Sequence, residues 1–238
     1  MAFHSFRFPG EDDSYRRARN ELLQAEIDLR RRVEEVAALR RHLPLGGEIP
    51  EDYIFDEGSA DLSDSQAVRQ VSLSQLFHPG KDTLAIYSFM FGPKMKAPCP
   101  MCTSIIDGLN ATVVNATQRV NLAVVAKSPL ERLRTFARER GWNRLRLLSS
   151  AGNSYNRDYY GENAEEGQQP SLNIFVRRSG KIHHFWHSEL VLVPSDPGQN
   201  QRHVDMIWPL WNLLDFTPEG RGSDWHPSLT YAHDSPNR

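Results

Sequence analysis

The two cysteines of the chain lie close together in the segment Cys99-Pro100-Met101-Cys102. This C-x-x-C follows the apolar run 84–91, which predicts a buried strand, and it precedes a segment with helical spacing. A thiolate at a helix N-terminus is stabilised by unpaired backbone N–H groups and by the helix dipole, and a second thiol one turn later can close a disulfide. The position and spacing of the cysteines therefore indicate thiol–disulfide chemistry.

The composition describes a chain that can bury a sizeable core. It has 238 residues, of which 39% are hydrophobic, and a formal net charge of −2. This charge gives no reason to expect a nucleic-acid partner, and no apolar run is long enough to span a membrane. Residues 1–10 lack the continuous apolar region of a secretory signal. Two cysteines without such a signal favour a reducing compartment, so we expect a cytoplasmic protein.

Residues 14–42 form a charged stretch without glycine or proline, and apolar residues recur along it at heptad-like intervals. The recurring residues are Leu22, Leu29, Val36 and Leu43. The spacing predicts a long helix that ends before Pro44. This helix could pack as an amphipathic element on its own domain, or it could pair with another subunit and form a homodimer.

A regular alternation of strands and helices begins after residue 80. Apolar runs predict strands at 83–91, 120–126 and 145–148, separated by helices at 103–117 and 129–140. Strands separated by helices imply right-handed crossovers and a parallel sheet, with the ligand site at the carboxyl ends of the strands. Cys99 lies at such an end.

The second half of the chain is less regular. Residues 151–169 form a polar loop that is long enough to be a lid or an insertion. Two strands around Ser179-Gly180 are expected to form an antiparallel hairpin. A final helix at about 201–214 contains Pro209, which should kink or split it. By contrast, residues 48–64 are acidic and predicted to be irregular.

These elements resemble the thioredoxin fold, in which a strand leads to C-x-x-C at a helix start and a proline precedes a later strand. The resemblance implies an α/β fold with a central mixed sheet flanked by helices, here with an N-terminal helical extension. Pro170, which opens the segment 170–175, matches the cis-proline that packs beside the active-site disulfide in that fold. We therefore expect a cis peptide bond at Pro170, although an ordinary trans loop proline is the alternative.

A closer resemblance covers residues 16–222. The segments that carry it include Asp52-Tyr53-Ile54-Phe55, Phe89-Met90-Phe91-Gly92-Pro93, Cys99-Pro100-Met101-Cys102 and Leu214-Asp215-Phe216-Thr217-Pro218-Glu219-Gly220-Arg221. They are similar to a bacterial thioredoxin-like family of predicted dithiol–disulfide oxidoreductases, most of which have no known function. The resemblance implies a redox role but no substrate. Pro98 stands where thioredoxin has tryptophan, so the reduction potential does not carry over.

The resemblance also implies an organisation and a set of roles. We expect an N-terminal helical arm at 1–47, a thioredoxin-like domain at 48–222 and a flexible tail at 223–238. Cys99 is the expected nucleophile, and Cys102 is the expected resolving thiol. The expected substrate-binding residues are Pro100, Met101 and Pro170. The partner is expected to be a protein or small-molecule disulfide or thiol, without a cofactor or a resident metal. Lys94 and Lys96 could help to hold the thiolate.

Metal binding is the main alternative to catalysis. His183, His184 and His187 lie on a predicted strand, where alternation puts His183 and His187 on one face and His184 on the other. Two thiolates and two imidazoles would satisfy zinc or copper, in a non-catalytic protein that binds metal or senses redox state. The spacing of these histidines suits a helix better than a strand, which favours the redox interpretation.

Peroxide reduction is a further alternative. Peroxidases of related fold use one attacking cysteine and a resolving cysteine, within a P-x-x-x-[TS]-x-x-C pattern. Here residues 94–98 offer no hydroxyl group before Cys99. The sequence therefore favours dithiol–disulfide exchange.

Overall fold

The long N-terminal helix predicted from the heptad-like spacing is α1 (Asp13–Arg41). Asp12 caps it, because its carboxylate accepts the backbone N–H of Tyr15 at 2.7 Å. Arg40 and Arg41 lie in the last turn, where positive charge interacts favourably with the helix dipole. The helix is therefore stabilised at both ends by local charges.

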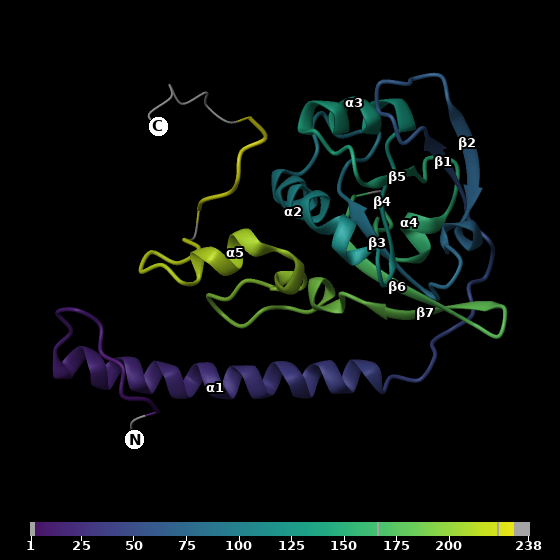
Figure 1. The fold of residues 1–238 in the computed structure, drawn as a ribbon. Helices are drawn as coiled ribbons and strands as arrows, with labels where there is room; N and C mark the ends of the chain where they lie inside the picture. The colour runs from purple at the N-terminus through teal and green to yellow at the C-terminus, as the bar shows by residue number, and fades with distance from the viewer. Residues whose placement is uncertain (1–2, 166, 223, 231–238) are drawn as a thin grey trace. The chain divides into compact units, whose positions relative to one another are not determined.

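The computed structural model describes residues 3–165, 167–222 and 224–230 (Figure 1). The chain divides into two units that meet at Pro44 and Leu45, and α1 makes up most of the first unit. Among the described residues, no helix is both long enough and apolar enough to cross a membrane.

The second unit is built around one mixed sheet, whose strands lie in the order β2-β1-β5-β4-β3-β6-β7 (Figure 1). The described strands are β1 (Ile54–Gly58), β2 (Val68–Ser72), β3 (Thr83–Phe89), β4 (Asn121–Ala126), β5 (Arg146–Ser149), β6 (Ser171–Arg178) and β7 (Lys181–His187). The strands β3, β4 and β5 are parallel neighbours, whereas β6 runs antiparallel to β3 and to β7. Every residue of β4 is buried, which explains its nearly continuous apolar sequence.

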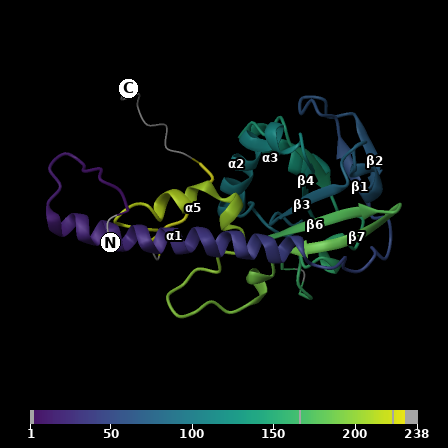
Figure 2. The same ribbon diagram turned by 60° about the horizontal axis from the view of Figure 1, so that its bottom comes forward.

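Helices cover both faces of this sheet. The described helices of the second unit are α2 (Pro100–Ala116), α3 (Leu130–Arg140), α4 (Tyr155–Asp158) and α5 (Pro209–Leu214). The helices α2, α3 and α5 share one apolar cluster with Phe89 of β3, whereas α4 packs with Phe55 and Phe175 in a second cluster. Figure 2 shows α2 and α3 on the same side of the sheet. Two right-handed crossovers in the same direction require this arrangement.

Two segments differ from what the sequence predicts. Residues 48–64 were expected to be irregular, but they contain β1, whose Asp56-Glu57 pair hides the strand pattern. Pairing with β2 and β5 supplies the hydrogen bonds of this strand, and local sequence does not report such distant partners. Residues 151–169 contain a packed element and not a lid, because Tyr155 and Asn156 of α4 are fully buried.

Two other predictions are confirmed. The β6–β7 hairpin turns at Ser179 and Gly180, whose φ angles of 51° and 80° are those that a two-residue turn requires. The last helix is split, since a 3-10 turn at Asp205–Ile207 precedes α5 and Pro209 opens α5. Proline fits the first position of a helix because its missing N–H would have no partner there.

The C-terminal tail was expected at 223–238. Residues 223 and 231–238 lie outside the described residues. Residues 224–230 form no helix or strand, but Trp225 and Leu229 contact the rest of the second unit.

Candidate active site

The dithiol lies where β3 passes into α2. The backbone N–H of Cys99 donates to the Met90 carbonyl at 3.1 Å, which ties the start of α2 to the end of β3. Cys99 is the N-cap residue of α2, and Pro100 occupies the first helical position. The backbone N–H and the hydroxyl of Thr103 both donate to the Cys99 carbonyl, at 3.0 and 2.9 Å. The structure therefore places the C-x-x-C at the helix N-terminus, as the sequence predicts.

The two thiols differ in exposure and acidity. Cys99 is half-buried, whereas Cys102 is 2% exposed. A hydrogen bond from the Cys102 thiol, helped by the backbone N–H groups of Cys102 and Met101, lowers the pKa of Cys99 to about 6 against the opposing effect of burial. Burial, followed by the adjacent Cys99, raises the pKa of Cys102 well above its ordinary value. At neutral pH the partly accessible Cys99 thiol is thus mostly ionised, whereas the buried Cys102 thiol keeps its proton.

Tyr87 lies behind the dithiol in the core. It belongs to β3 and is fully buried. Burial raises the pKa of its hydroxyl, and this hydroxyl lies beside Cys102 and partly offsets the rise of that thiol's pKa. Tyr87 is not among the site residues expected from the sequence, although a tyrosine within a mostly apolar buried strand is a signal that a buried polar partner is needed.

Arg132 holds the loop that leads to the dithiol. Its guanidinium, which comes from α3, donates to the carbonyls of Gly92 and Lys96 at 3.1 Å each and also to the Met95 carbonyl. The same group lies 4.3 Å from the ring centroid of Phe91. These contacts fix residues 92–97 immediately before Cys99. The sequence carried no signal for this role, because Arg132 is one of several arginines in its helix.

The substrate-binding residues expected from the sequence are placed as follows. Pro100 and Met101 are half-buried beside Cys99, and Lys94 and Lys96 are exposed in the preceding loop. Pro170 directly precedes β6. Among the described residues there is no cis peptide bond, so the expectation of a cis bond at Pro170 is wrong.

The trans form is the lower-energy isomer of an X–Pro bond by about 0.5–1 kcal/mol, which accounts for the trans bond at Pro170. The Gln169 N–H donates to the Gly161 carbonyl at 2.9 Å, and Ser171 already pairs with Ser88 of β3. Both neighbours of the proline are thus fixed by backbone contacts. Gln168 packs against Gly92, where an added Cβ would lie 2.8 Å from the Gln168 Cγ. A glutamine side chain therefore lies against the dithiol loop at this point.

The histidines of β7 are arranged differently from the prediction. A bulge between Ile174 and Phe175 of β6 shifts the register, so that His184 lies opposite Phe175 and His187 opposite Asn173. His184 and His187 consequently share one face and His183 lies on the other, because a bulge breaks simple alternation. Among the described residues, no three histidine, cysteine or acidic side chains converge as a metal site needs. The alternative site of two thiolates and two imidazoles is therefore not formed.

The histidines on and near the face shared by His184 and His187 have lowered pKa values. Burial, followed by the nearby His187, lowers the pKa of His184 to about 4. Burial also lowers the pKa values of His187 and His203. The Nε2 atom of His184 lies 2.9 Å from the Asn173 Oδ1. The lowered pKa values keep these three imidazoles neutral at neutral pH.

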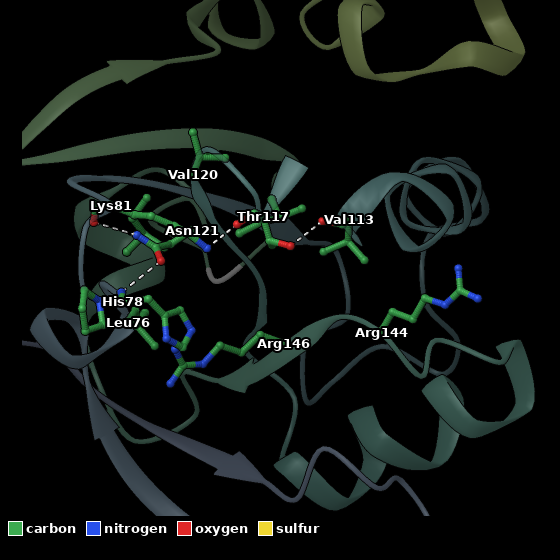
Figure 3. A pocket seen from close by; sticks show the side chains of 12 residues that line it. Leu76, His78, Lys81, Val113, Thr117, Val120, Asn121, Arg144 and Arg146 are labelled. Carbon is green, nitrogen blue, oxygen red and sulfur yellow. Dashed lines mark hydrogen bonds between the residues drawn. The ribbon is translucent and has the colours of Figure 1, made fainter. Parts of the chain in front are cut away.

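A cavity of about 420 Å³ lies at the opposite end of the sheet from the dithiol (Figure 3). It adjoins the amino ends of β3 and β4. Asn121 accepts the backbone N–H of His78 at 3.0 Å and donates to the carbonyls of Lys81 and Thr83. The Lys81 ammonium donates to the Thr117 carbonyl. The central polar groups of the cavity are thus engaged in holding the fold together.

The topology and the dithiol together define the class of the protein. A central strand leads to C-x-x-C at a helix start, two further strands follow in parallel on one side, and an antiparallel hairpin completes the sheet on the other. This is a thioredoxin-like fold. The chain belongs to the bacterial family of proteins of unknown function DUF899, whose sequence model matches residues 7–235. The family resemblance drawn from the sequence is thereby confirmed.

The comparison with solved structures finds peroxiredoxins. Thioredoxin peroxidase I of Plasmodium yoelii has a TM-score of 0.45 at 18% identity, covering 72% of this chain and 91% of that chain. A reduced 2-Cys peroxiredoxin of Plasmodium vivax has a TM-score of 0.46 at 18% identity, covering 72% and 96%. Peroxidoxin BcpB of Mycobacterium tuberculosis has a TM-score of 0.42 at 15% identity, covering 71% and 96%. These values are too low to carry an argument about activity. No curated protein matches the chain.

Proposed function

We propose that the protein is a dithiol–disulfide oxidoreductase that works through Cys99 and Cys102. The proposal rests on the pKa values of the two neighbouring thiols, which are shifted in opposite directions. The pKa of half-buried Cys99 is lowered to about 6, and that of buried Cys102 is raised. A nucleophilic thiol must be ionised and accessible, whereas a resolving thiol must stay protected until the mixed disulfide forms.

The reaction consists of two balanced exchanges. The Cys99 thiolate attacks one sulfur of a substrate disulfide, so that a bond from Cys99 to that sulfur forms and the substrate disulfide breaks with release of one thiolate. Cys102 then loses its proton and attacks the Cys99 sulfur, which releases the second substrate thiol. The substrate is reduced by two electrons, and Cys99 and Cys102 are oxidised to a disulfide. In the reverse direction the same steps oxidise a dithiol substrate.

The surrounding residues have supporting roles in this proposal. Arg132 fixes the loop that positions Cys99, and Tyr87 lies next to the proton that Cys102 must lose. Pro100, Met101 and Pro170 are proposed to contact the substrate, which is a protein or small-molecule disulfide or thiol. A reducing compartment such as the cytoplasm suits a dithiol of this kind.

Peroxide reduction, the activity in the names of the structural neighbours, is less well supported. It needs hydrogen-bond donors aimed at a peroxide beside the attacking sulfur. The hydroxyls of Thr103 and Ser104 near the helix start already donate to the carbonyls of Cys99 and Met101, at 2.9 Å each. Residues 94–98 supply no other hydroxyl.

Trapping of mixed disulfides tests the proposal. The variant C102S should accumulate mixed disulfides with a model disulfide such as oxidised glutathione and with proteins of a cell extract, because its intermediate cannot be resolved. The matched variant C99S should accumulate none, because its remaining thiol is buried. Equal trapping by both variants, or by neither, would contradict the proposal.

A further inference from the structure

A tryptophan from outside the dithiol helix is hydrogen-bonded to the first turns of that helix. The Trp208 indole N–H donates to the Ser104 hydroxyl of α2 at 2.9 Å. The same hydroxyl donates to the Met101 carbonyl, also at 2.9 Å. Ser104 thus accepts one hydrogen bond and donates the next, so the two bonds form one continuous network, Trp208–Ser104–Met101, that ends between the two cysteines.

The network ends on a peptide group that faces the sulfur of Cys99. The Met101 carbonyl and the Cys102 N–H belong to the same peptide group. Because Cys99 is the N-cap residue of α2, Met101 and Cys102 occupy the two positions whose N–H groups an N-cap side chain faces. These two N–H groups also help to lower the pKa of Cys99. A donor on the Met101 carbonyl polarises the peptide group, and its N–H becomes a stronger donor.

The fold holds Trp208 in place beside α2. Trp208 is buried at the junction between a 3-10 turn and α5. Arg221 fixes this junction, because its guanidinium binds Asp205 at the start of the turn and Asp215 at the end of α5, at 2.7 Å each. The helix α5 also lies close to α2, since a Cβ added at Gly108 would lie 3.6 Å from the first residue of α5. The indole N–H is therefore directed at α2 by a rigid support.

Trp211 provides an internal comparison. It lies on α5 next to Trp208, with ring centroids 5.2 Å apart, and it is buried in the same apolar cluster. Within the described part of the chain, however, its indole N–H has no hydrogen-bond partner. Of these two neighbouring tryptophans, it is thus Trp208 whose N–H is connected to the dithiol helix.

We propose that Trp208 and Ser104 are positioning residues of the dithiol, and that their hydrogen-bond network strengthens the backbone N–H group that faces the Cys99 thiolate. The inference rests on the dithiol function proposed above and deepens it. Cys99 carries a negative charge only in the reduced protein, so the network stabilises the reduced protein, and this stabilisation ends when the sulfur becomes part of a disulfide. Trp208 thus makes Cys99 more acidic and the disulfide more oxidising.

The pH profile of Cys99 alkylation tests this inference in the full chain. W208F removes the indole donor and keeps an aromatic ring in the core. The rate with iodoacetamide, normalised to its plateau at high pH, gives the thiolate fraction of Cys99. Cooperative strengthening is about 10–30% of a hydrogen bond to a charged group, so W208F should lower the thiolate fraction at pH 5 by about 1.5-fold to fourfold. The equilibrium with glutathione should shift toward the oxidised protein by a similar factor.

Three further variants complete the test. W211F is the matched control, because it removes an indole N–H without a partner from the same cluster, and it should keep the wild-type profile. S104A breaks the network at the Met101 carbonyl and should shift the profile at least as far as W208F. S104T restores a hydroxyl group and should restore the wild-type profile. Urea denaturation followed by circular dichroism measures the stability of each variant separately.

The outcomes that overturn the inference are specific. Identical profiles for W208F and W211F would overturn it, and so would a wild-type profile for S104A. If W208F is less stable than the wild type but keeps its profile, Trp208 supports the fold alone, and the inference is again overturned. Each of these results leaves mixed-disulfide trapping by C102S intact, so failure of this inference is distinguishable from failure of the proposed function.

Discussion

Replacement of Arg132 by alanine should loosen the loop in front of Cys99. The guanidinium donates to the loop carbonyls of Gly92, Met95 and Lys96, makes a longer contact of 3.5 Å with the Pro93 carbonyl, and lies over Phe91. Each hydrogen bond contributes about 1 kcal/mol net, because the freed carbonyls can be rehydrated, and the cation–π contact adds about 0.5–1 kcal/mol. The expected loss in the free energy of unfolding is therefore about 3–4 kcal/mol.

Urea denaturation followed by tryptophan fluorescence measures this loss, and R138A is the matched control. Arg138 lies on the same helix but is exposed, and it donates to one distant carbonyl, that of Leu62, at 2.9 Å. R138A should lose about 1 kcal/mol or less. R132K, which keeps the charge but not the planar fork, should recover part of the loss. If R132A and R138A destabilise the protein equally, Arg132 does not hold the loop before Cys99 in the way proposed.

R132A should also affect the chemistry of the dithiol. A mobile loop no longer holds Cys99 in place at the start of α2, so its pKa should rise toward that of an ordinary thiol. The rate of alkylation at pH 5.5 should then fall, while the rate at pH 9 stays the same. A variant that is destabilised but keeps the acidic Cys99 would show that Arg132 acts on stability alone.

Two further predictions concern other parts of the second unit. The pKa of His184 is lowered to about 4 in the folded protein, so the stability that depends on its neutral form is present above about pH 6.5 and is lost as the pH falls toward 4. Thermal unfolding measured as a function of pH should show this loss for the wild type and for the control H183Q, and a flatter profile for H184Q. In G92A, the new Cβ would lie 2.8 Å from the Gln168 Cγ, so the free energy of unfolding measured by urea denaturation should fall by about 1–3 kcal/mol. The double variant G92A/Q168A should regain most of this loss, and no recovery would refute the contact.

The central elements of the fold could be predicted because their information is local. The strands β3 and β4 are buried on both faces, so their sequences are nearly continuous runs of apolar residues. The start of α2 is marked by Pro100 and by the spacing of the cysteines. The acidity of Cys99 follows from the helix N-terminus and from its neighbour Cys102, both of which are visible in four residues of sequence.

The features that could not be predicted depend on distant contacts. Arg132 reaches the dithiol loop only because α3 packs beside it. The bulge in the β6–β7 hairpin, which puts His184 and His187 on one face, has no signal in the alternation of the residues themselves. The isomer of the bond at Pro170, which is trans, has no signal in the residues around it. Trp225 and Leu229 contact the rest of the second unit, although the composition of their segment suggests a frayed tail.

Site-resolved alkylation tests whether Cys99 is the acidic, reactive thiol and Cys102 the protected one. Reduced wild-type protein is treated with iodoacetamide between pH 4 and pH 10, and the modification of each cysteine is measured by peptide mass spectrometry. Cys99 should be alkylated with a midpoint near pH 6, as its pKa requires, and Cys102 should stay protected in the folded protein. A midpoint for Cys99 above pH 8, or equal modification of both cysteines, would contradict this assignment of roles.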